Sequence, residues 1–149
     1  MNDFLALDIS GAGMRAQRMR MRVISENLAN TETVGPAGPY RRKDIVFKAV
    51  PIHDFDNTLQ DTLGGIRGKA TTVDSIAVGE VMADKSPPIQ VYEPGNPLAN
   101  AQGMVAKPNI NVIREMADMM EASRSYEANL SAAKATQDML ISATELVRK

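Results

Sequence analysis

The chain has 149 residues and a net charge of −1, with 44% hydrophobic residues, 23% charged residues and no cysteine. That balance is typical of a folded chain with one domain, or with one small domain plus extended segments. The near-neutral charge gives no electrostatic reason to expect binding to nucleic acid or to an anionic membrane. The lack of cysteine excludes a disulfide framework, a thiolate metal site and a cysteine nucleophile.

Neither a membrane span nor ordinary secretion is indicated by the sequence. No stretch approaches the ~20 consecutive apolar residues that a membrane-spanning helix needs. The N-terminus lacks the basic segment and following apolar run of a secretory signal peptide. If the protein leaves the cytoplasm, we expect another route to carry it.

Residues 2–33 contain no proline and are predicted to form a long helix. Gly35 and Pro36 are expected to stop this helix, and Gly11 and Gly13 to weaken it by ~1 kcal/mol each relative to alanine. Its apolar residues recur in alternating steps of four and three, as in a coiled coil. This N-terminal seam consists of Leu5, Ile9, Ala12, Ala16, Met19 and Val23.

A second long helix is predicted from Pro108, together with Asn109 or Asn111, to the end of the chain. The same steps of four and three define a C-terminal seam: Val112, Met116, Met119, Ser123, Tyr126, Leu130, Ala133, Gln137, Leu140, Thr144 and Val147. A helix over residues 112–148 would be ~55 Å long. A chain of this size cannot cover such a helix, so we expect other subunits to pack against it. The seams are rich in small residues, and we expect the terminal segments to be loose in the free monomer and ordered on assembly.

The middle of the chain reads as β-structure with turns. Residues 40–52, 73–82, 89–92 and 104–106 are β-rich segments separated by proline and glycine. The predicted fold is therefore mostly α with a small β insertion. Residues 1–35 and 108–149 would form a discontinuous, coiled-coil-like axial core, and residues 36–107 a small β-domain with long loops.

The charges of the two predicted helices are of opposite sign and could face each other, within a subunit or between subunits. The basic stretch carries Arg15, Arg18, Arg20 and Arg22, and the acidic one carries Glu115, Asp118, Glu121 and Glu127 beside Arg114 and Arg124. We interpret the arginines as a solvated or interface surface rather than a nucleic-acid arm, because no aromatic residue is available for base stacking.

Few residues suggest a chemical site. His53 is the only histidine and is interpreted as a loop residue, since no second histidine or cysteine could complete a metal site. The sequon at Asn129 lies on the predicted helix seam and is discounted as a glycosylation site. No nucleotide, metal or nucleophile motif occurs, so we expect no cofactor. Two alternatives stay open: a cytoplasmic coiled-coil adaptor, and a hydrolase that uses Asp74 and Glu80 or Asp84.

Residues 25–33 read S-E-N-L-A-N-T-E-T at the end of the first predicted helix. This closely resembles the N-L-A-N-x-x-T signature of the flagellar rod and hook proteins, with Asn27, Leu28, Ala29, Asn30 and Thr33 at the matching positions. Residues 7–17, 38–44, 86–88, 91–95, 108–112 and 116–129 are similar to proximal-rod members of that family. The resemblance thus runs through nearly the whole chain in order, although residues 53–73 match poorly and residues 95–97 and 103–105 depart from the family pattern.

The resemblance implies a structural subunit of the flagellar basal-body rod within the periplasm, and not an enzyme. It implies export by the flagellar type III apparatus without a cleaved signal peptide. The implied partners are other rod proteins, copies of this chain, and the MS ring and rod-base adaptor at the proximal end, with no nucleic acid and no small-molecule substrate. The terminal helices would form the inner layer of a tubular drive shaft that transmits torque.

Two groups of polar residues mark the junction between the first helix and the β-domain. Asn27 and Asn30 could be ordinary capping residues, but we favour amides that bond across subunits, because Leu28 and Ala29 between them are apolar. The second group is Tyr40, Arg41, Arg42 and Lys43. Contact with acidic groups of a neighbouring subunit and a simple solvated loop are equally consistent with this basic segment.

Overall fold

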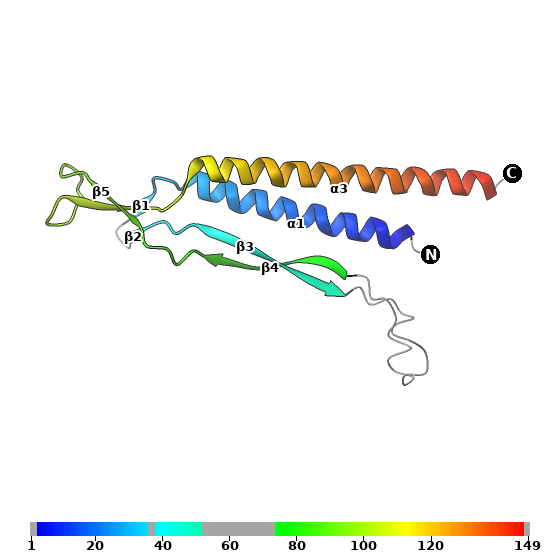
Figure 1. Ribbon diagram of the computed structural model, residues 1–149, viewed down its shortest axis with the longest axis horizontal. Coiled ribbons are helices and arrows are strands. Elements are labelled where there is room, and N and C mark those ends of the chain that lie inside the picture. Colours follow the sequence, from blue (N-terminus) through cyan, green and yellow to red (C-terminus); the bar gives the residue numbers. More distant parts are fainter. Residues whose placement is uncertain (1–2, 36–37, 52–73, 148–149) are drawn as a thin grey trace, which may run out of the picture.

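A computed structural model of the chain describes residues 3–35, 38–51 and 74–147 (Figure 1). Two antiparallel helices, α1 (Asp3–Ala29) and α3 (Val112–Val147), lie side by side, and the strands come between them in sequence. The fold class predicted from the sequence, long terminal helices with a small β insertion, is confirmed. Within the described ranges, no helix is both long enough and apolar enough to cross a membrane.

The strands in these ranges pair into short antiparallel ribbons. β3 (Lys43–Pro51) pairs with β4 (Asp74–Ala83), with an irregularity between Ile45 and Phe47. β5 (Ile89–Tyr92) pairs with β6 (Met104–Lys107), and β1 (Val34–Gly35) pairs with β2 (Gly38–Pro39). The four longer strands lie where the sequence predicts them, to within three residues at each end. β1 and β2 are not predicted, because two residues are too few to show an alternating pattern.

Helix α1 is the central element of the arrangement, since it contacts both α3 and the β3–β4 hairpin (Figure 1). The β5–β6 hairpin lies at the end of the molecule where α1 ends and α3 begins, and both chain termini lie at the opposite end. The junction between helices and strands is therefore held from several directions, whereas the helix ends near the termini have fewer neighbours.

The contact between the helices uses small side chains. Ala16 of α1 and Ala122 of α3 are 1% and 0% exposed, and Ala12 is also buried. At Gly13 a Cβ atom would lie 2.9 Å from the side-chain amide of Asn129, so the two backbones are close there. Small residues permit this approach but bury little apolar area, and the helix pair gains little free energy from each contact.

Two contacts show the register of the helix pair. Asn27 is bonded to Glu115, and Gly13 lies against Asn129. Fourteen residues separate the two positions on each helix, so the register is constant along the pair. Continued to the first described residue of α1, this register places Asp3 opposite Met139. The rest of α3, up to Val147, extends beyond the described part of α1.

Helix α1 ends earlier than the sequence predicts. The expected stop was Gly35 and Pro36, but the helix ends at Ala29. The Asn30 amide donates a hydrogen bond to the Glu26 carbonyl at 2.8 Å, and the Thr31 hydroxyl donates one to the Leu28 carbonyl at 2.8 Å. These side chains add hydrogen bonds to carbonyls of the last turn and so help to cap the C-terminal end of the helix.

Candidate functional site

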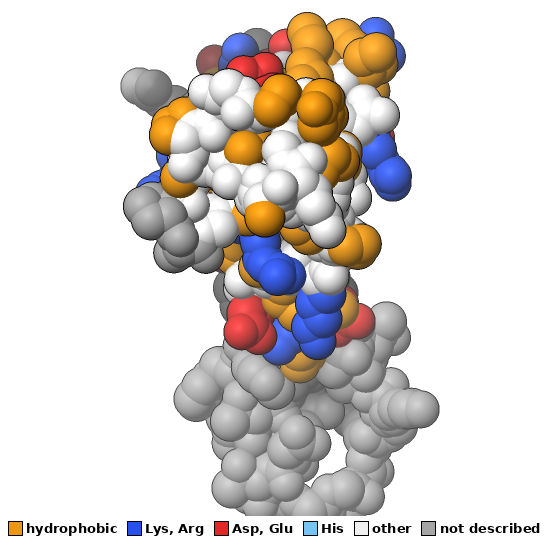
Figure 2. All heavy atoms as spheres, turned by 90° about the vertical axis from the view of Figure 1, so that its left-hand side faces the viewer, with side chains coloured by type: hydrophobic (Ala, Val, Ile, Leu, Met, Phe, Trp, Pro, Cys, Tyr) orange, Lys and Arg blue, Asp and Glu red, His pale blue; other side chains and the backbone are white. Residues whose placement is uncertain are grey.

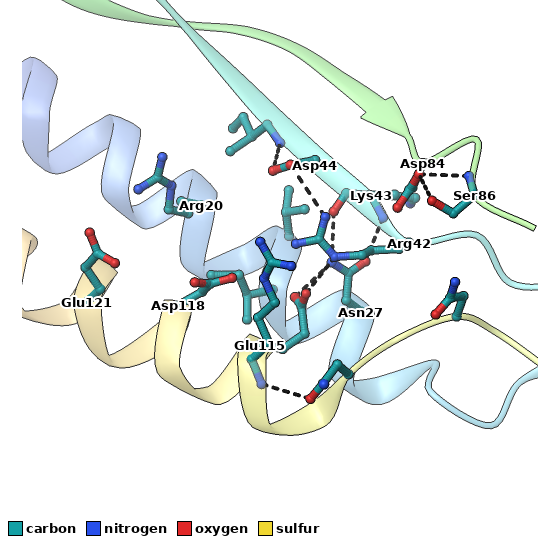
Figure 3. Close-up of a pocket in the computed structure, with 16 residues that line it drawn as sticks. Arg20, Asn27, Arg42, Lys43, Asp44, Asp84, Ser86, Glu115, Asp118 and Glu121 are labelled. Atoms are coloured by element: carbon teal, nitrogen blue, oxygen red, sulfur yellow. Dashed lines mark hydrogen bonds and ion pairs between the residues drawn. The ribbon is translucent and has the colours of Figure 1, made fainter.

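The best-defined polar site lies where α1 ends, β3 begins and α3 begins. We call it the junction cluster, and it consists of Asn27, Tyr40, Arg42, Lys43 and Glu115. Figure 3 shows these elements converging from three directions, with Asn27 and Glu115 pointing toward each other. Chain segments up to 88 residues apart are therefore joined by side-chain hydrogen bonds at one point.

Asn27 is 1% exposed and bonds through both ends of its amide. Its Nδ2 donates to the Lys43 carbonyl at 2.8 Å and to Glu115 Oε2 at 3.1 Å. Its Oδ1 accepts from the Lys43 backbone N–H at 2.9 Å and from the Tyr40 hydroxyl at 3.2 Å. All the bonding capacity of the amide is thus used within one chain. The expectation that Asn27 bonds across subunits is corrected, because burial between α1, β3 and α3 leaves it no outward contact.

Glu115 lies in the first turn of α3 and is 1% exposed. Its Oε1 accepts a hydrogen bond from Arg42 Nε at 2.7 Å, so both carboxylate oxygens have partners. The turn that carries it is capped by Asn111, whose side-chain oxygen accepts from the Arg114 N–H at 3.1 Å. A carboxylate near a helix N-terminus is further stabilised by the backbone N–H groups there.

Arg42 is the cation that neutralises this buried carboxylate. Burial lowers the pKa of Arg42, but its hydrogen bond and charge interaction with Glu115 outweigh burial, and the pKa is raised above its ordinary value. The arginine also lies 3.5 Å from an oxygen of Asp44. Arg42 therefore stays charged at neutral pH, and its bond to Glu115 acts as a structural link between β3 and α3.

A second layer of charge surrounds the cluster. Lys43 Nζ lies 3.2 Å from Glu26 Oε2, and Arg22 Nε lies 3.3 Å from the other oxygen of Glu26. The hydrogen bond and charge of Lys43 lower the pKa of the Glu26 carboxyl. Burial raises the pKa of the Tyr40 hydroxyl, which keeps it neutral as a donor to Asn27. These exposed pairs orient the cluster but each contributes little free energy.

A groove of about 530 Å³ opens beside the junction cluster between α1, β3 and α3. Its lining includes cations (Arg20, Arg42, Lys43 and Arg114) and anions (Asp44, Asp84, Glu115, Asp118 and Glu121). Arg20 lies over the Phe47 ring at 4.6 Å from its centroid. Charges of both signs line the groove, so it has no single electrostatic preference for an anion or a cation.

The carboxylates proposed for a hydrolase do not converge. Asp84 lines the groove, but Asp74 and Glu80 do not. The Ser86 backbone N–H and hydroxyl bond Asp84 and lower its pKa, the opposite of what a general acid needs. Across the described ranges, no group of three metal-ligating side chains is assembled. His53 lies outside the described residues.

The residues of the N-terminal seam lie on the inner side of α1. Ala12, Ala16 and Val23 are buried, and Leu5, Ile9 and Met19 are half-buried. For the remaining motif positions, Leu28 is half-buried, whereas Ala29 and Thr33 are exposed. Arg41 is exposed, unlike Arg42. Of the basic segment at residues 41–43, the structure therefore brings Arg42 and Lys43 into the junction cluster and leaves Arg41 outside it.

The face of α3 that packs against α1 includes only some of the positions predicted for the C-terminal seam. Met119, Tyr126, Ala133 and Leu140 are half-buried, as are Ser123 and Leu130, but Gln137 and Thr144 are exposed; Val147 has no described side chain. Val112 and Met116 were placed on the seam, yet they are 41% and 54% exposed. The inward positions are instead Glu115, Ala122 and Asn129, one residue earlier in each case. The bonds of Glu115 to Asn27 and Arg42 orient α3 so that these three positions face α1 and β3.

Sequence reasoning placed Glu115 in an acidic stretch that could face the arginines of the first helix, and it did not identify the bonds of Glu115 to Asn27 and Arg42. One signal could have identified it: an acid in the first helical turn, one residue from a seam position, in a chain with a basic segment at the domain junction. The opposite charges of α1 and α3 form no ion pair with each other among the side chains that the structure describes. Among the described side chains, the ion pair that reaches α3 is Arg42 with Glu115, and no arginine of residues 15–22 takes part.

Exposed apolar side chains gather at the junction end of the molecule, over the β5–β6 hairpin and the start of α3 (Figure 2). Ile89, Tyr92 and Leu98 are 47%, 68% and 44% exposed, and Ile113 is 80% exposed. The described part of the chain buries eight apolar residues but exposes sixteen large ones. So much exposed apolar surface is characteristic of a subunit that is covered by neighbours.

Comparison with known proteins decides the family. A profile described as flagellar basal body rod FlgEFG protein C-terminal matches residues 101–146, which include β6 and nearly all of α3. The flagellar basal-body rod protein FlgC of Agrobacterium fabrum is 37% identical over 146 residues, covering 96% of this chain and 94% of the relative. This chain belongs to the FlgC family of flagellar basal-body rod proteins.

Other FlgC proteins agree over similar lengths. The protein of Salmonella typhimurium is 39% identical over 136 residues, or 90% of each chain, and that of Aquifex aeolicus is 40% identical over 140 residues, covering 93% of this chain and 92% of the relative. The family resemblance predicted from the N-L-A-N-x-x-T motif is confirmed. In this FlgC-family chain the first asparagine of the motif, Asn27, is the centre of the junction cluster.

Proposed function

We propose that this chain is a structural subunit of the bacterial flagellar basal-body rod and assembles through its two terminal helices. The observation that best supports the proposal is that the outer surface of α3 exposes large apolar side chains, in a chain that belongs to the FlgC family. Large exposed apolar residues lie in the first turns of this helix and again near its end, among them Ile113, Met116, Met120, Met139, Ile141 and Leu146. Burial of each large side chain stabilises an assembly by ~1.5–3 kcal/mol, so neighbouring helices would bind this surface strongly.

The proposal includes the organisation of the chain and its partners. Residues 1–35 and 108–149 form the axial core, and residues 36–107 form the β-rich part held to it by the junction cluster. The partners are other rod proteins and further copies of this chain, with the MS ring and rod-base adaptor at the proximal end. The flagellar type III apparatus exports the chain without a cleaved signal peptide, and the rod crosses the periplasm and transmits torque.

A structural role rather than catalysis is part of the same proposal. The relatives carry names of rod proteins, and the carboxylates considered for hydrolysis are spread over β4 and the following turn. The amide of Asn27 is fully hydrogen-bonded, and Glu115 is 1% exposed with a partner on each oxygen, so neither side chain is accessible to a substrate.

Deletion of the gene for this chain tests the proposal. We expect basal bodies seen by electron microscopy to keep their membrane rings but to lack rod, hook and filament, and the cells not to swim. Re-expression of the wild-type chain should restore both, with empty vector as control. Complete flagella in the deletion strain would contradict the rod function and favour a cytoplasmic adaptor.

A further inference from the structure

The apolar contact between α1 and α3 does not by itself select one register. The inner face of α1 carries Ala12, Ala16, Met19 and Val23, and the inner face of α3 carries Ala122, Tyr126, Ala133 and Leu140, so both faces follow a seven-residue repeat. A slide of α1 by one heptad toward the end of α3 would bring it alongside the part of α3 that now extends past it. Small seam residues such as Ala12 and Ala16 would fit either arrangement, because alanine fills no specific hole.

The junction cluster, in contrast, has all its buried hydrogen bonds formed in only one register. After the same slide Asn27 would lie opposite Ala122, which offers no side-chain hydrogen bond, and Glu115 would lose Asn27. Both residues are 1% exposed, and a buried amide or carboxylate without a partner is strongly unfavourable. Asn27 also bonds both backbone groups of Lys43, so its position is tied to β3 as well.

We infer that Asn27 and Glu115, neutralised by Arg42, are specificity-determining residues that restrict α1 to the α3 of its own chain in a single register. This inference follows from the fold. Its consequence for building a rod rests on the proposed function: where many copies of α3 are present together, α1 could otherwise pair with the α3 of another copy, as in a domain swap. Buried polar groups are known to select register and partner in coiled coils at a cost in stability.

If Asn27 and Glu115 select the register, a variant without them can stay stable and still lose the single register. Replacement of both residues by leucine, Asn27→Leu with Glu115→Leu, removes the polar pair but keeps bulk and adds apolar contact. Such replacements often leave a protein as stable as before or more stable. We therefore expect a helical, folded variant whose helices no longer pair in one way. Glu121→Leu is the matched control, because Glu121 is an exposed glutamate of the same helix outside the described ion pairs.

Disulfide trapping reads the register directly, because the chain has no native cysteine. The register continued from Asn27 and Glu115 places Val23 opposite Met119, and the one-heptad slide would place it opposite Tyr126. Reporter chains carry Val23→Cys with either Met119→Cys or Tyr126→Cys in the purified full-length protein. A heptad step of ~10 Å is too long for a disulfide, so each pair reports one register. Non-reducing gels separate cross-links within a chain from those between chains.

In the wild-type and Glu121→Leu backgrounds we expect the Met119→Cys reporter to form an intrachain disulfide and the Tyr126→Cys reporter to remain at least tenfold less oxidised. In the double-leucine background we expect the Tyr126→Cys product and interchain dimers to rise to comparable amounts. The inference is overturned if the double-leucine chain keeps only the native intrachain product, or if the wild-type chain already forms both. Should circular dichroism show that the double-leucine chain is not helical, Glu115→Gln is measured instead, and unchanged selectivity there would overturn the inference.

Discussion

At the scale of single residues, one buried ion pair supports the junction of three chain segments. Glu115 accepts hydrogen bonds from Arg42 and Asn27 while being 1% exposed, and Arg42 keeps 22% of its side chain accessible. A buried pair need not add net stability over an apolar pair of the same shape. Loss of Glu115 alone is different, because the buried Asn27 amide and the half-buried Arg42 would both lose a partner.

Glu115→Ala should therefore destabilise the protein by about 1–3 kcal/mol, because it leaves Asn27 without one acceptor and Arg42 with Asp44 as its remaining charge partner. The measurement is urea unfolding of the purified chain. Glu121→Ala, an exposed glutamate of the same helix, should change stability by no more than about 0.5 kcal/mol. Equal effects of the two substitutions would show that Glu115 is not the structural link described here.

At the scale of elements, α1 contains two glycines with different surroundings. A Cβ atom at Gly11 would meet only the end of the Arg15 side chain, at 3.6 Å. At Gly13 it would lie 2.9 Å from Asn129, whose amide is held by its own bond to the Ser125 carbonyl. The first glycine weakens the helix without a packing benefit, whereas the second permits the close approach of α3.

Gly11→Ala should accordingly stabilise the protein by ~1 kcal/mol, the difference in helix propensity. Gly13→Ala should destabilise it by about 1 kcal/mol or more, because the new methyl overlaps Asn129. Thermal unfolding of both variants measures the contrast. Adding Asn129→Ala to Gly13→Ala should recover most of the loss, and no recovery would mean that the crowding lies elsewhere.

The β5–β6 hairpin contains an ion pair whose strength depends on pH. Lys107 Nζ bonds Glu93 Oε1, and this bond, with one from Asn96, lowers the pKa of Glu93 below its ordinary value of 4.5. The same bond raises the pKa of Lys107 above 10.5. The pair therefore stabilises the hairpin at pH values between the pKa of Glu93 and the pKa of Lys107. Its contribution is lost as the pH falls through the lowered pKa of Glu93, or rises through the raised pKa of Lys107.

Glu93→Gln should lower the thermal midpoint slightly at neutral pH and leave it unchanged well below pH 4.5, where the wild-type carboxyl is protonated too. The effect is small because the pair is partly exposed. Thermal scans of both chains from neutral to acid pH measure the difference. Glu80→Gln on β4 serves as the control, and a Glu93→Gln difference that persists in acid would contradict the assignment.

At the scale of the whole molecule, the exposed surface of α3 is the feature that a monomer does not need. Met139 lies at the level of the start of α1 and is 64% exposed, and Leu146, 76% exposed, lies beyond the described part of α1. Neither side chain contributes to the core of the single chain, so a polar substitution there acts on assembly and not on folding.

Met139→Lys should leave the urea unfolding of the purified chain within about 0.5 kcal/mol of wild type but reduce or abolish swimming when it replaces the wild-type gene. The reason is that a lysine ammonium in a helix–helix contact between subunits would be buried without a partner. Lys134→Arg, also exposed on α3, is a control that keeps the charge and should swim normally. Normal swimming of Met139→Lys would show that this part of α3 faces solvent in the rod.

The sequence by itself determined the two long helices, the four longer strands and the family, because heptad spacing, proline and glycine positions and the N-L-A-N-x-x-T motif are local signals. It did not determine which face of α3 meets α1, since Met, Ala and Leu occur around most of that helix and several faces satisfy the same spacing. Only the tertiary structure decided this, by placing Asn27, Arg42 and Glu115 together from three distant segments. Partners that are far apart in the chain and meet through hydrogen bonds leave no periodic trace in the sequence, and the junction cluster is held by such partners.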